Sequence, residues 1–430
     1  MVNVAVFPAG TEIGLEINRA LKYSTHIKLF GLSSIPDHSR CVYKNYSDEI
    51  PYYSDKSFIQ KLNKFIEENR IDYIYPAHDD VQLFLTENAN LIKAEIITSE
   101  LDTVRLCRSK IKTYKYFSEF RFIPQFYNSN EIDKLGSIDF PIFIKPDIGQ
   151  GSKGAIKLNS LEELKYAIQG NEKLVICEYL PGEEYTVDCF TDFKGKLRVC
   201  NIRNRIRIKS GISVNSKILK LDDEVSEIAT IINDKLRLRG AWFFQLKKDK
   251  NGKYKLMEIA PRVSGTMGLS RNTGTNYPLL SIFDKMGTEI KIIKNSYDIE
   301  VDRALFSRFI TNLNYDSIYI DLDDTLIIDN KVNNYLMMFV YQSLNQGKKI
   351  YLLTKHENDV YNTLEKYRIS KNIFDKIFHL SKEEHKSNYI EDSNSIFIDD
   401  SFSERYDVST KTKIAVFDSS EIESLIDWRL

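Results

Sequence analysis

The chain has 430 residues, of which 42% are hydrophobic and 28% charged, and its formal net charge is −1. This length exceeds what one hydrophobic core holds, so we expect two to four domains. The near-zero net charge does not indicate binding to nucleic acid or to an anionic membrane. No apolar stretch approaches the roughly 20 residues of a membrane span, and the N-terminus lacks the basic leader of a signal peptide. The five scattered cysteines contain no CxxC pair, so we predict reduced thiols and a cytoplasmic protein.

Residues 1–100 alternate short apolar strands with amphipathic helices. Strands are predicted at 2–7, 26–32, 71–77 and 95–99, and helices at 13–22, 57–69 and 79–92. This alternation predicts a doubly wound α/β domain around a parallel sheet. The turn PAGTEIG (8–14) does not fit GxGxxG, so we interpret it as an ordinary strand-to-helix connection. In PAHDD (76–80) we expect Asp79 or Asp80 to cap a helix, with substrate binding by His78 or Asp79 as the alternative.

Residues 141–158, PIFIKPDIGQGSKGAIKL, are the first indication of phosphate binding. A strand carries Lys145, and a glycine-rich loop at 149–154 leads into another strand. Glycines allow backbone N–H groups to approach a phosphate closely, and Lys145 and Lys153 add positive charge. The segment lacks the GKS/T and the following helix of a Walker loop. It predicts a hairpin flap, and a flexible hairpin without a ligand is the alternative.

Two later segments add candidate nucleotide and metal ligands. In residues 175–190, VICEYLPGEEYTVDCF, the backbone of 178–180 can pair with an adenine edge, and Glu184 can accept protons from ribose hydroxyls. In residues 241–265, an Asn-Gly turn joins two strands that carry Gln245 and Glu258. Oxygen ligands on neighbouring strands suit Mg²⁺, which binds few protein groups together with phosphate oxygens.

Residues 203–211, RNRIRIKSG, place four cations at every second position. If the segment is one strand, Arg203, Arg205, Arg207 and Lys209 share one face. Four cations on one face repel one another unless they meet anions, so we expect this face to bind anions. A solvated edge strand protected by its charge is the alternative.

These segments, in this order, resemble the ATP-grasp superfamily over roughly residues 1–300. The resemblance implies bound ATP and Mg²⁺, and an acyl phosphate that a nucleophile, usually an amine, converts to an amide-type product. By the resemblance, Arg207 and Arg262 hold substrate oxygens, with Arg271 a further candidate. The family often has Asn two residues after the metal-binding Glu, where this chain has Ala260, so we expect a second metal either to be held less firmly or to have its site completed by water. The remaining residues carried over from the family are the phosphate-binding Lys110 and Lys145, the lid residues Gly151, Ser152, Lys153 and Gly154, the adenine hinge Glu178, Tyr179 and Leu180, the ribose ligand Glu184, and the metal ligands Gln245 and Glu258.

Acidic and basic residues at 315–430 define a second candidate site. The strand of SIYIDLDDTLI ends at Asp321 and Asp323, KKIYLLTKH places Thr354 at a strand end, EEHKSNYI contains Lys386, and SIFIDDSF places Asp399 at another strand end. Strand ends on one edge of a parallel sheet converge, and carboxylates this close need a cation.

This segment resembles the haloacid dehalogenase superfamily, with a Rossmann-like fold and no large inserted cap. The resemblance implies that Asp321 is the nucleophile that forms an aspartyl phosphate and that Asp323 is the general acid/base. Thr354 and Lys386 would hold the phosphoryl group. Asp321, Asp323 and Asp399 would form a second Mg²⁺ site. Lys382 competes with Lys386, whose spacing to Asp399 we prefer.

We therefore predict an α/β multidomain, bifunctional enzyme that joins a ligase to a phosphatase acting on a phosphomonoester. The predicted parts are an α/β domain at 1–100, an ATP-grasp domain at 101–300, a linker at 301–314 and a phosphatase domain at 315–430. The substrates would be a small carboxylate and an amine, and ATP-grasp enzymes often form homodimers. Phosphorylation or carboxylation by the first part, and a second part that only binds a phosphorylated metabolite, remain alternatives.

Overall fold

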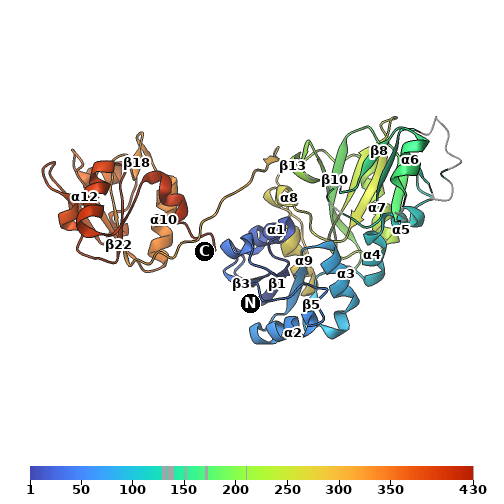
Figure 1. The fold of residues 1–430 in the computed structure, drawn as a ribbon, viewed down its shortest axis with the longest axis horizontal. Helices are drawn as coiled ribbons and strands as arrows, with labels where there is room; N and C mark the ends of the chain where they lie inside the picture. The colour runs from blue at the N-terminus through green and yellow to red at the C-terminus, as the bar shows by residue number, and fades with distance from the viewer. Residues whose placement is uncertain are drawn as a thin grey trace. The chain divides into compact units, whose positions relative to one another are not determined.

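The structure, a computed structural model, describes residues 1–127, 132, 140–149, 151, 153–169, 173–209 and 211–429. The chain divides into two compact units, Met1–Leu305 and Phe306–Leu430. In Figure 1 the first unit runs from blue to yellow and the second from orange to red. Among the described residues, no helix combines the length and the apolar composition that a membrane crossing requires.

The first unit begins with a five-stranded parallel sheet in the order β3-β2-β1-β4-β5. Alternate residues of β1 enter different cores: Val4 and Val6 pack with α1, whereas Ala5 and Phe7 pack with α2 and α3. Helices therefore cover both faces, which confirms the predicted doubly wound sheet. The strands are β1 (Val2–Phe7), β2 (Ile27–Leu32), β3 (Asn45–Ser47), β4 (Tyr73–Pro76) and β5 (Glu95–Ile96), and the helices are α1 (Glu12–Leu21), α2 (Phe58–Asn69) and α3 (Asp79–Glu87).

Two antiparallel four-stranded sheets follow, in the orders β6-β9-β7-β8 and β11-β10-β14-β15. The helix α7 covers the second of these sheets with apolar residues that include Ile228 and Ile232. The strands are β6 (Phe126–Tyr127), β7 (Ile142–Pro146), β8 (Ile156–Leu158), β9 (Leu174–Glu178), β10 (Glu184–Thr191), β11 (Leu197–Asn204), β14 (Gly240–Lys248) and β15 (Tyr254–Ala260), and the helices are α4 (Leu101–Arg108), α5 (Lys110–Tyr116), α6 (Leu161–Ala167), α7 (Asp223–Lys235), α8 (Gly268–Asn272) and α9 (Tyr277–Lys285).

A small third sheet, β12-β13-β16, joins a hairpin from the middle of the unit to a strand near its end. The strands are β12 (Arg207–Lys209), β13 (Ile212–Lys217) and β16 (Glu300–Asp302). Asn215 lies opposite Asp302, and its side chain donates to Glu300 Oε1 at 2.7 Å. Part of the segment predicted to be a linker is therefore a strand of the first unit.

The second unit is built on a five-stranded parallel sheet in the order β21-β20-β17-β22-β23. The helices α10 and α11 cover the face with Ile318 and Ile320, and α12 packs on the face with Tyr319. The strands are β17 (Ser317–Ile320), β18 (Ile327–Ile328), β19 (Lys331–Val332), β20 (Lys349–Thr354), β21 (Lys376–His379), β22 (Ser395–Ile398) and β23 (Ala415–Phe417), and the helices are α10 (Asn334–Asn345), α11 (Val360–Lys366) and α12 (Phe402–Thr412).

Candidate active sites

A cavity of about 190 Å³ in the first unit collects most of the predicted nucleotide and metal ligands. The two antiparallel four-stranded sheets, α5 and the glycine-containing loops all contribute to its wall. The lining residues that matter for the site are Lys110, Lys145, Gly149, Gly151, Lys153, Glu184, Arg205, Gly211, Gln245, Lys247 and Glu258.

Two lysines project into this cavity. Lys145 Nζ donates to Tyr114 Oη at 2.8 Å and to the Met257 carbonyl at 3.1 Å. Lys110 Nζ donates to the carbonyls of Asp147 and Gly149 at 3.3 and 3.2 Å. The start of α5 is tied to the loop after β7, because the Asp147 carboxylate accepts from the Ile111 N–H at 2.8 Å. Burial lowers the pKa of both lysine ammonium groups, so an incoming anion would relieve an electrostatic cost.

The oxygen ligands lie on three adjacent strands of one sheet. Gln245 on β14 is directly opposite Glu258 on β15, and Gln245 also pairs with Thr186, two residues after Glu184 on β10. Because residues two apart on a strand share a face, Glu184, Gln245 and Glu258 point the same way. The Lys247 ammonium lies 3.8 Å from the Glu184 carboxylate. This set of oxygens facing lysines fits a divalent cation bound together with phosphate oxygens.

A smaller, mostly apolar pocket adjoins the cavity and shares Phe143, Lys247 and Met257 with it. Glu178 ends β9, and its carboxylate accepts from the Gln125 N–H while its own N–H donates to the Gln125 carbonyl, both at 2.8 Å. The hinge residues Tyr179 and Leu180 follow in the wall of this pocket. Aromatic and aliphatic walls suit a flat heteroaromatic base.

The glycine-rich loop reaches the far side of the cavity. Gly151 and Gly154 have φ angles of 67° and 72°, a region that favours glycine. A Cβ on Gly211 would lie 2.1 Å from the carbonyl carbon of Gly151, so the two loops touch through their backbones. Lys153 is exposed and lines the cavity. Ser152, predicted to belong to the lid, lies outside the described residues.

The prediction that residues 203–209 form one strand with a cationic face is wrong. β11 ends at Asn204 and β12 begins at Arg207, so the period-two argument fails between them. Arg203 is buried and pairs with Asp188 at 2.8 Å, and the exposed Arg207 pairs with Asp302 at 2.5 Å. Arg205 is the one of these three that reaches the cavity, where its Nη1 contacts the Glu184 carboxylate and donates to Gln245 Oε1 at 2.8 Å.

The expected substrate arginines are paired with acidic residues of the N-terminal α/β part. Arg262 forms a two-point contact with the Asp79 carboxylate at 2.6 and 2.7 Å, and Arg271 binds Glu16 at 3.0 Å. Although burial disfavours its charge, Asp79 raises the pKa of Arg262. Arg262 and Asp79 line a small cavity that shares Lys110, Gly149 and Glu258 with the larger one. Arg262 therefore lies close to Lys110, a predicted phosphate ligand, although the Asp79 carboxylate already pairs with its charge.

The α3 cap differs from the prediction. His78, and neither Asp79 nor Asp80, occupies the N-cap position, and its ring nitrogen accepts from the Asp80 N–H at 3.2 Å. Asp79 sits in the first turn of the helix, from where it reaches Arg262.

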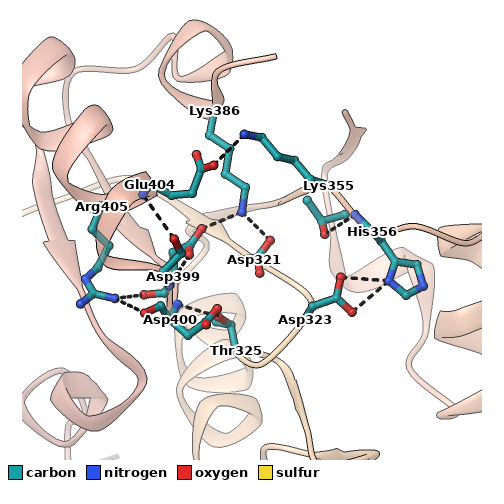
Figure 2. Close-up of polar contacts among 12 residues, drawn as sticks. Asp321, Asp323, Thr325, Lys355, His356, Lys386, Asp399, Asp400, Glu404 and Arg405 are labelled. Carbon is teal, nitrogen blue, oxygen red and sulfur yellow. Dashed lines mark hydrogen bonds and ion pairs between the residues drawn. The ribbon is translucent and has the colours of Figure 1, made fainter. Parts of the chain in front are cut away.

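In the second unit, three predicted residues meet at the carboxyl ends of parallel strands. Asp321 directly follows β17 and Asp399 directly follows β22, which are neighbours in the sheet. Lys386 Nζ donates to Asp321 Oδ1 at 2.5 Å and to Asp399 Oδ2 at 2.6 Å, and all three residues are buried (Figure 2). Lys382, the competing candidate, is exposed and pairs with Glu357 instead.

The electrostatics of this cluster favour a bound cation. Burial raises the pKa of Asp321 to about 7, with Lys386 opposing the shift and Asp399 adding to it. Burial also raises the pKa of Asp399. One oxygen each of Asp321, Asp399 and Asp400 lies within 4.8 Å of the others, which fits a divalent metal bound by carboxylates.

Asp323 was predicted to be the third metal ligand, but the group of close carboxylates contains Asp400 in its place. Asp323 and Thr354 lie beside this cluster. The Asp323 carboxylate is half exposed and contacts His356 Nδ1 at 2.9 Å. Thr354 ends β20, is fully buried, and its Oγ1 accepts from the His356 N–H at 3.2 Å. His356 ends the segment KKIYLLTKH, in which only Thr354 was predicted to have a role.

Comparison with known proteins supports the fold of the first unit. Residues 170–304 match the family model described as ATP-grasp in the biosynthetic pathway with Ter operon. The chain is 27% identical to the D-alanine–D-alanine ligase of Thermotoga petrophila and 28% identical to that of Thermotoga maritima, over 94 residues in each case. These matches cover 21% of the chain, which spans only 31% of the length of either relative.

Three solved structures each align with 68% of the chain. N5-carboxyaminoimidazole synthetase from Staphylococcus aureus, complexed with ADP, has a TM-score of 0.57 at 16% identity over 80% of its chain. Biotin carboxylase from Campylobacter jejuni has a TM-score of 0.57 at 18% identity over 73% of its chain. The L-amino acid ligase from Bacillus licheniformis has a TM-score of 0.51 at 16% identity over 75% of its chain. The chain therefore contains a mixed α/β, ATP-grasp-like fold.

Proposed function

We propose that the first unit is an ATP-dependent carboxylate–amine ligase. The observation that carries this proposal is the convergence of Lys145, Glu184 and Glu258 on one cavity, beside a small, mostly apolar pocket lined by Tyr179 and Leu180. The ATP-grasp-like fold and the short matches to D-alanine–D-alanine ligases support it. The carboxylate and amine classes come from this likeness alone, because the cavity does not identify either substrate.

The residues of this chain would act mainly by position and charge. Bound MgATP supplies the phosphoryl group and the cation that offsets its charge. Tyr179 and Leu180 would hold the base and Glu184 the ribose. Lys110 and Lys145 would neutralise the phosphates, and Gln245 with Glu258 would ligate Mg²⁺. A substrate carboxylate would attack the terminal phosphate, and an amine would then displace phosphate from the acyl carbon.

ADP release tests this proposal. The full chain, supplied with pooled carboxylates and amines, should release ADP, and Glu258→Gln should lower the rate by at least roughly 100-fold by removing a charged metal ligand. Glu224→Gln, at an exposed position on α7, is the matched control and should retain the rate. If Glu258→Gln and wild type release ADP equally, the proposed nucleotide site is wrong.

For the second unit we propose a Mg²⁺-dependent phosphomonoesterase of the haloacid dehalogenase type. The observation that carries it is the contact of Lys386 with both Asp321 and Asp399 at the strand ends. Asp321 would attack phosphorus while Asp323 gives its proton to the departing alcohol oxygen. Asp323 would then take a proton from water, which attacks the phosphorus and releases phosphate from Asp321. Mg²⁺, held by Asp321 and Asp399, would supply charge neutralisation, and Thr354 with Lys386 would bind phosphoryl oxygens.

A phosphomonoester assay without ATP separates this proposal from a module that only binds a phosphorylated metabolite. Wild type with Mg²⁺ should release phosphate from p-nitrophenyl phosphate, and Asp321→Asn should not. Equal, background-level release by both proteins would favour the binding module.

The fusion suggests a sequence of two reactions. We propose that the ligase joins a phosphorylated building block and that the phosphatase then removes its phosphate. Asp321→Asn should accumulate a phosphorylated conjugate that is detectable by mass spectrometry. Identical products from wild type and Asp321→Asn would contradict the proposed order of reactions.

A further inference from the structure

His356 holds the proposed general acid/base of the second unit at its carboxylate. The His356 Nδ1 lies 2.9 Å from both Oδ1 and Oδ2 of Asp323. Whenever Asp323 is ionised its oxygens can only accept, and the imidazole Nδ1–H is then the donor. Figure 2 shows the Asp323 carboxylate directed toward the ring of His356. This symmetric contact fixes the orientation of the carboxylate and leaves a lone pair on each oxygen to carry the proton that Asp323 passes to the leaving group.

The ring of His356 is itself held from its other side. His356 Nε2 lies 2.8 Å from Thr363 Oγ1 on α11, and the side chain of His356 is only 11% exposed, whereas that of Asp323 is 52% exposed. The Thr363 hydroxyl can serve as donor or acceptor, so it matches either protonation state of the ring. A chain of two contacts therefore runs from a helix to an exposed carboxylate.

The backbone of His356 is anchored as well. Its N–H donates to Thr354 Oγ1 at 3.2 Å, and its carbonyl is contacted by His379 Nε2 at 2.7 Å. His356 thus touches two residues to which the proposed phosphatase mechanism gives a role, Thr354 through the backbone and Asp323 through the side chain. An ordinary surface ion pair, which contributes little, would not need a ring fixed at both nitrogens.

We propose that His356 is a positioning residue that aims Asp323 at the leaving-group oxygen of the phosphomonoester. This inference rests on the proposed phosphatase function. In the first step the bond from phosphorus to the ester oxygen breaks, and that oxygen takes the proton of Asp323. A poor leaving group depends on this proton, whereas a good one departs with little help. The loss of His356 should therefore affect substrates according to their leaving groups.

The test compares kcat/KM for phenyl phosphate and p-nitrophenyl phosphate, two aryl esters of similar shape, with full-length protein and Mg²⁺. Phenol is the poorer leaving group. His356→Ala should lower kcat/KM for phenyl phosphate by roughly 10- to 100-fold and that for p-nitrophenyl phosphate by a much smaller factor. His356→Asn, whose amide can still donate to Asp323, should recover most of the loss.

Two further variants separate positioning from a general disturbance of the fold. Thr363→Val removes the hydroxyl at Nε2 and should give a smaller loss with the same preference for p-nitrophenyl phosphate. Glu357→Gln, which changes the exposed neighbour of His356 that pairs with Lys382, should leave both values unchanged.

The outcomes distinguish failure of this inference from failure of the proposed function. If wild type hydrolyses neither ester faster than Asp321→Asn, the phosphatase proposal fails and the inference fails with it. If wild type is active but His356→Ala and Thr363→Val lower both values equally, or leave phenyl phosphate unaffected, the inference alone is wrong.

Discussion

Arg205 and Gln245 are joined by a hydrogen bond of 2.8 Å from Nη1 to Oε1, and the same guanidinium nitrogen contacts Glu184. Arg205 follows the last residue of β11, and its Nη2 donates to the Gly211 carbonyl at 2.8 Å. One arginine thus links a proposed ribose ligand, a proposed metal ligand and the loop that touches the lid.

Replacing Arg205 should therefore damage the ligase site. Arg205→Met should lower kcat/KM for ADP release by about 100-fold or more, because a charged group at the nucleotide is lost. Arg207→Met is the matched control two residues away, where the side chain is 57% exposed and pairs with Asp302. It should stay within about twofold of wild type. Equal losses in the two variants would contradict the assignment.

The contact between Gly211 and Gly151 predicts sensitivity to a single methyl group. Gly211→Ala would place its Cβ 2.1 Å from a Gly151 backbone atom and should force the lid away. We expect KM for ATP to rise by roughly 10- to 100-fold. Gly252→Ala is the control, because Gly252 has a similar positive φ of 77° but no neighbour within 4 Å. The Gly252→Ala variant should lose only about 1 kcal/mol of stability from the unfavourable backbone conformation and should bind ATP normally.

The Asp79–Arg262 pair should contribute strongly to the stability of the first unit. Both side chains are mostly buried, with exposures of 15% for Asp79 and 12% for Arg262. Asp79→Ala therefore leaves the buried charge of Arg262 without its partner. The expected loss in the free energy of unfolding is about 3–5 kcal/mol. Glu100→Ala breaks the exposed pair with Arg237 and should cost less than about 1 kcal/mol. Denaturant unfolding of the full-length variants, followed by the transition of the first unit, measures both.

The raised pKa of Asp321 predicts a pH dependence of the metal-free second unit. A carboxyl whose pKa is about 7 when folded binds a proton more tightly than it does unfolded, where its pKa is about 3.9. The stability of the second unit should therefore fall as pH rises from about 4 to about 7, and Asp399 acts in the same direction. Thermal unfolding with chelator, compared between wild type and Asp321→Asn, checks this. The variant should show a weaker fall, and an identical slope would contradict the assignment.

The sequence predicted the parts of the sites that depend on local strand pattern. Asp321, Thr354 and Asp399 lie at the ends of apolar runs, and parallel strands bring such ends together. Gln245 and Glu258 flank an Asn-Gly turn, which predicts that their strands pair in antiparallel fashion. The register shift between Gln245 and Leu246, which places Gln245 opposite Glu258, could not be predicted from the turn.

The sequence did not predict contacts that depend on distant ion-pair partners. Arg203 and Arg207 lie in different environments because the strand ends at Asn204 and because Arg203 pairs with Asp188 and Arg207 with Asp302. No spacing rule reveals these partners. The pairing of Arg262 with Asp79 joins residues 183 positions apart. Such contacts are set by how the sheets pack, and no periodic pattern in a single sequence indicates that packing.

A crystal structure of the full chain with Mg²⁺ and a non-hydrolysable ATP analogue tests the central claim most directly. We expect the base beside Tyr179 and Leu180, the phosphates within hydrogen-bond distance of Lys110 and Lys145, and the metal on Glu258. An analogue bound elsewhere, with Lys145 and Glu258 making no contact to it, would contradict the account.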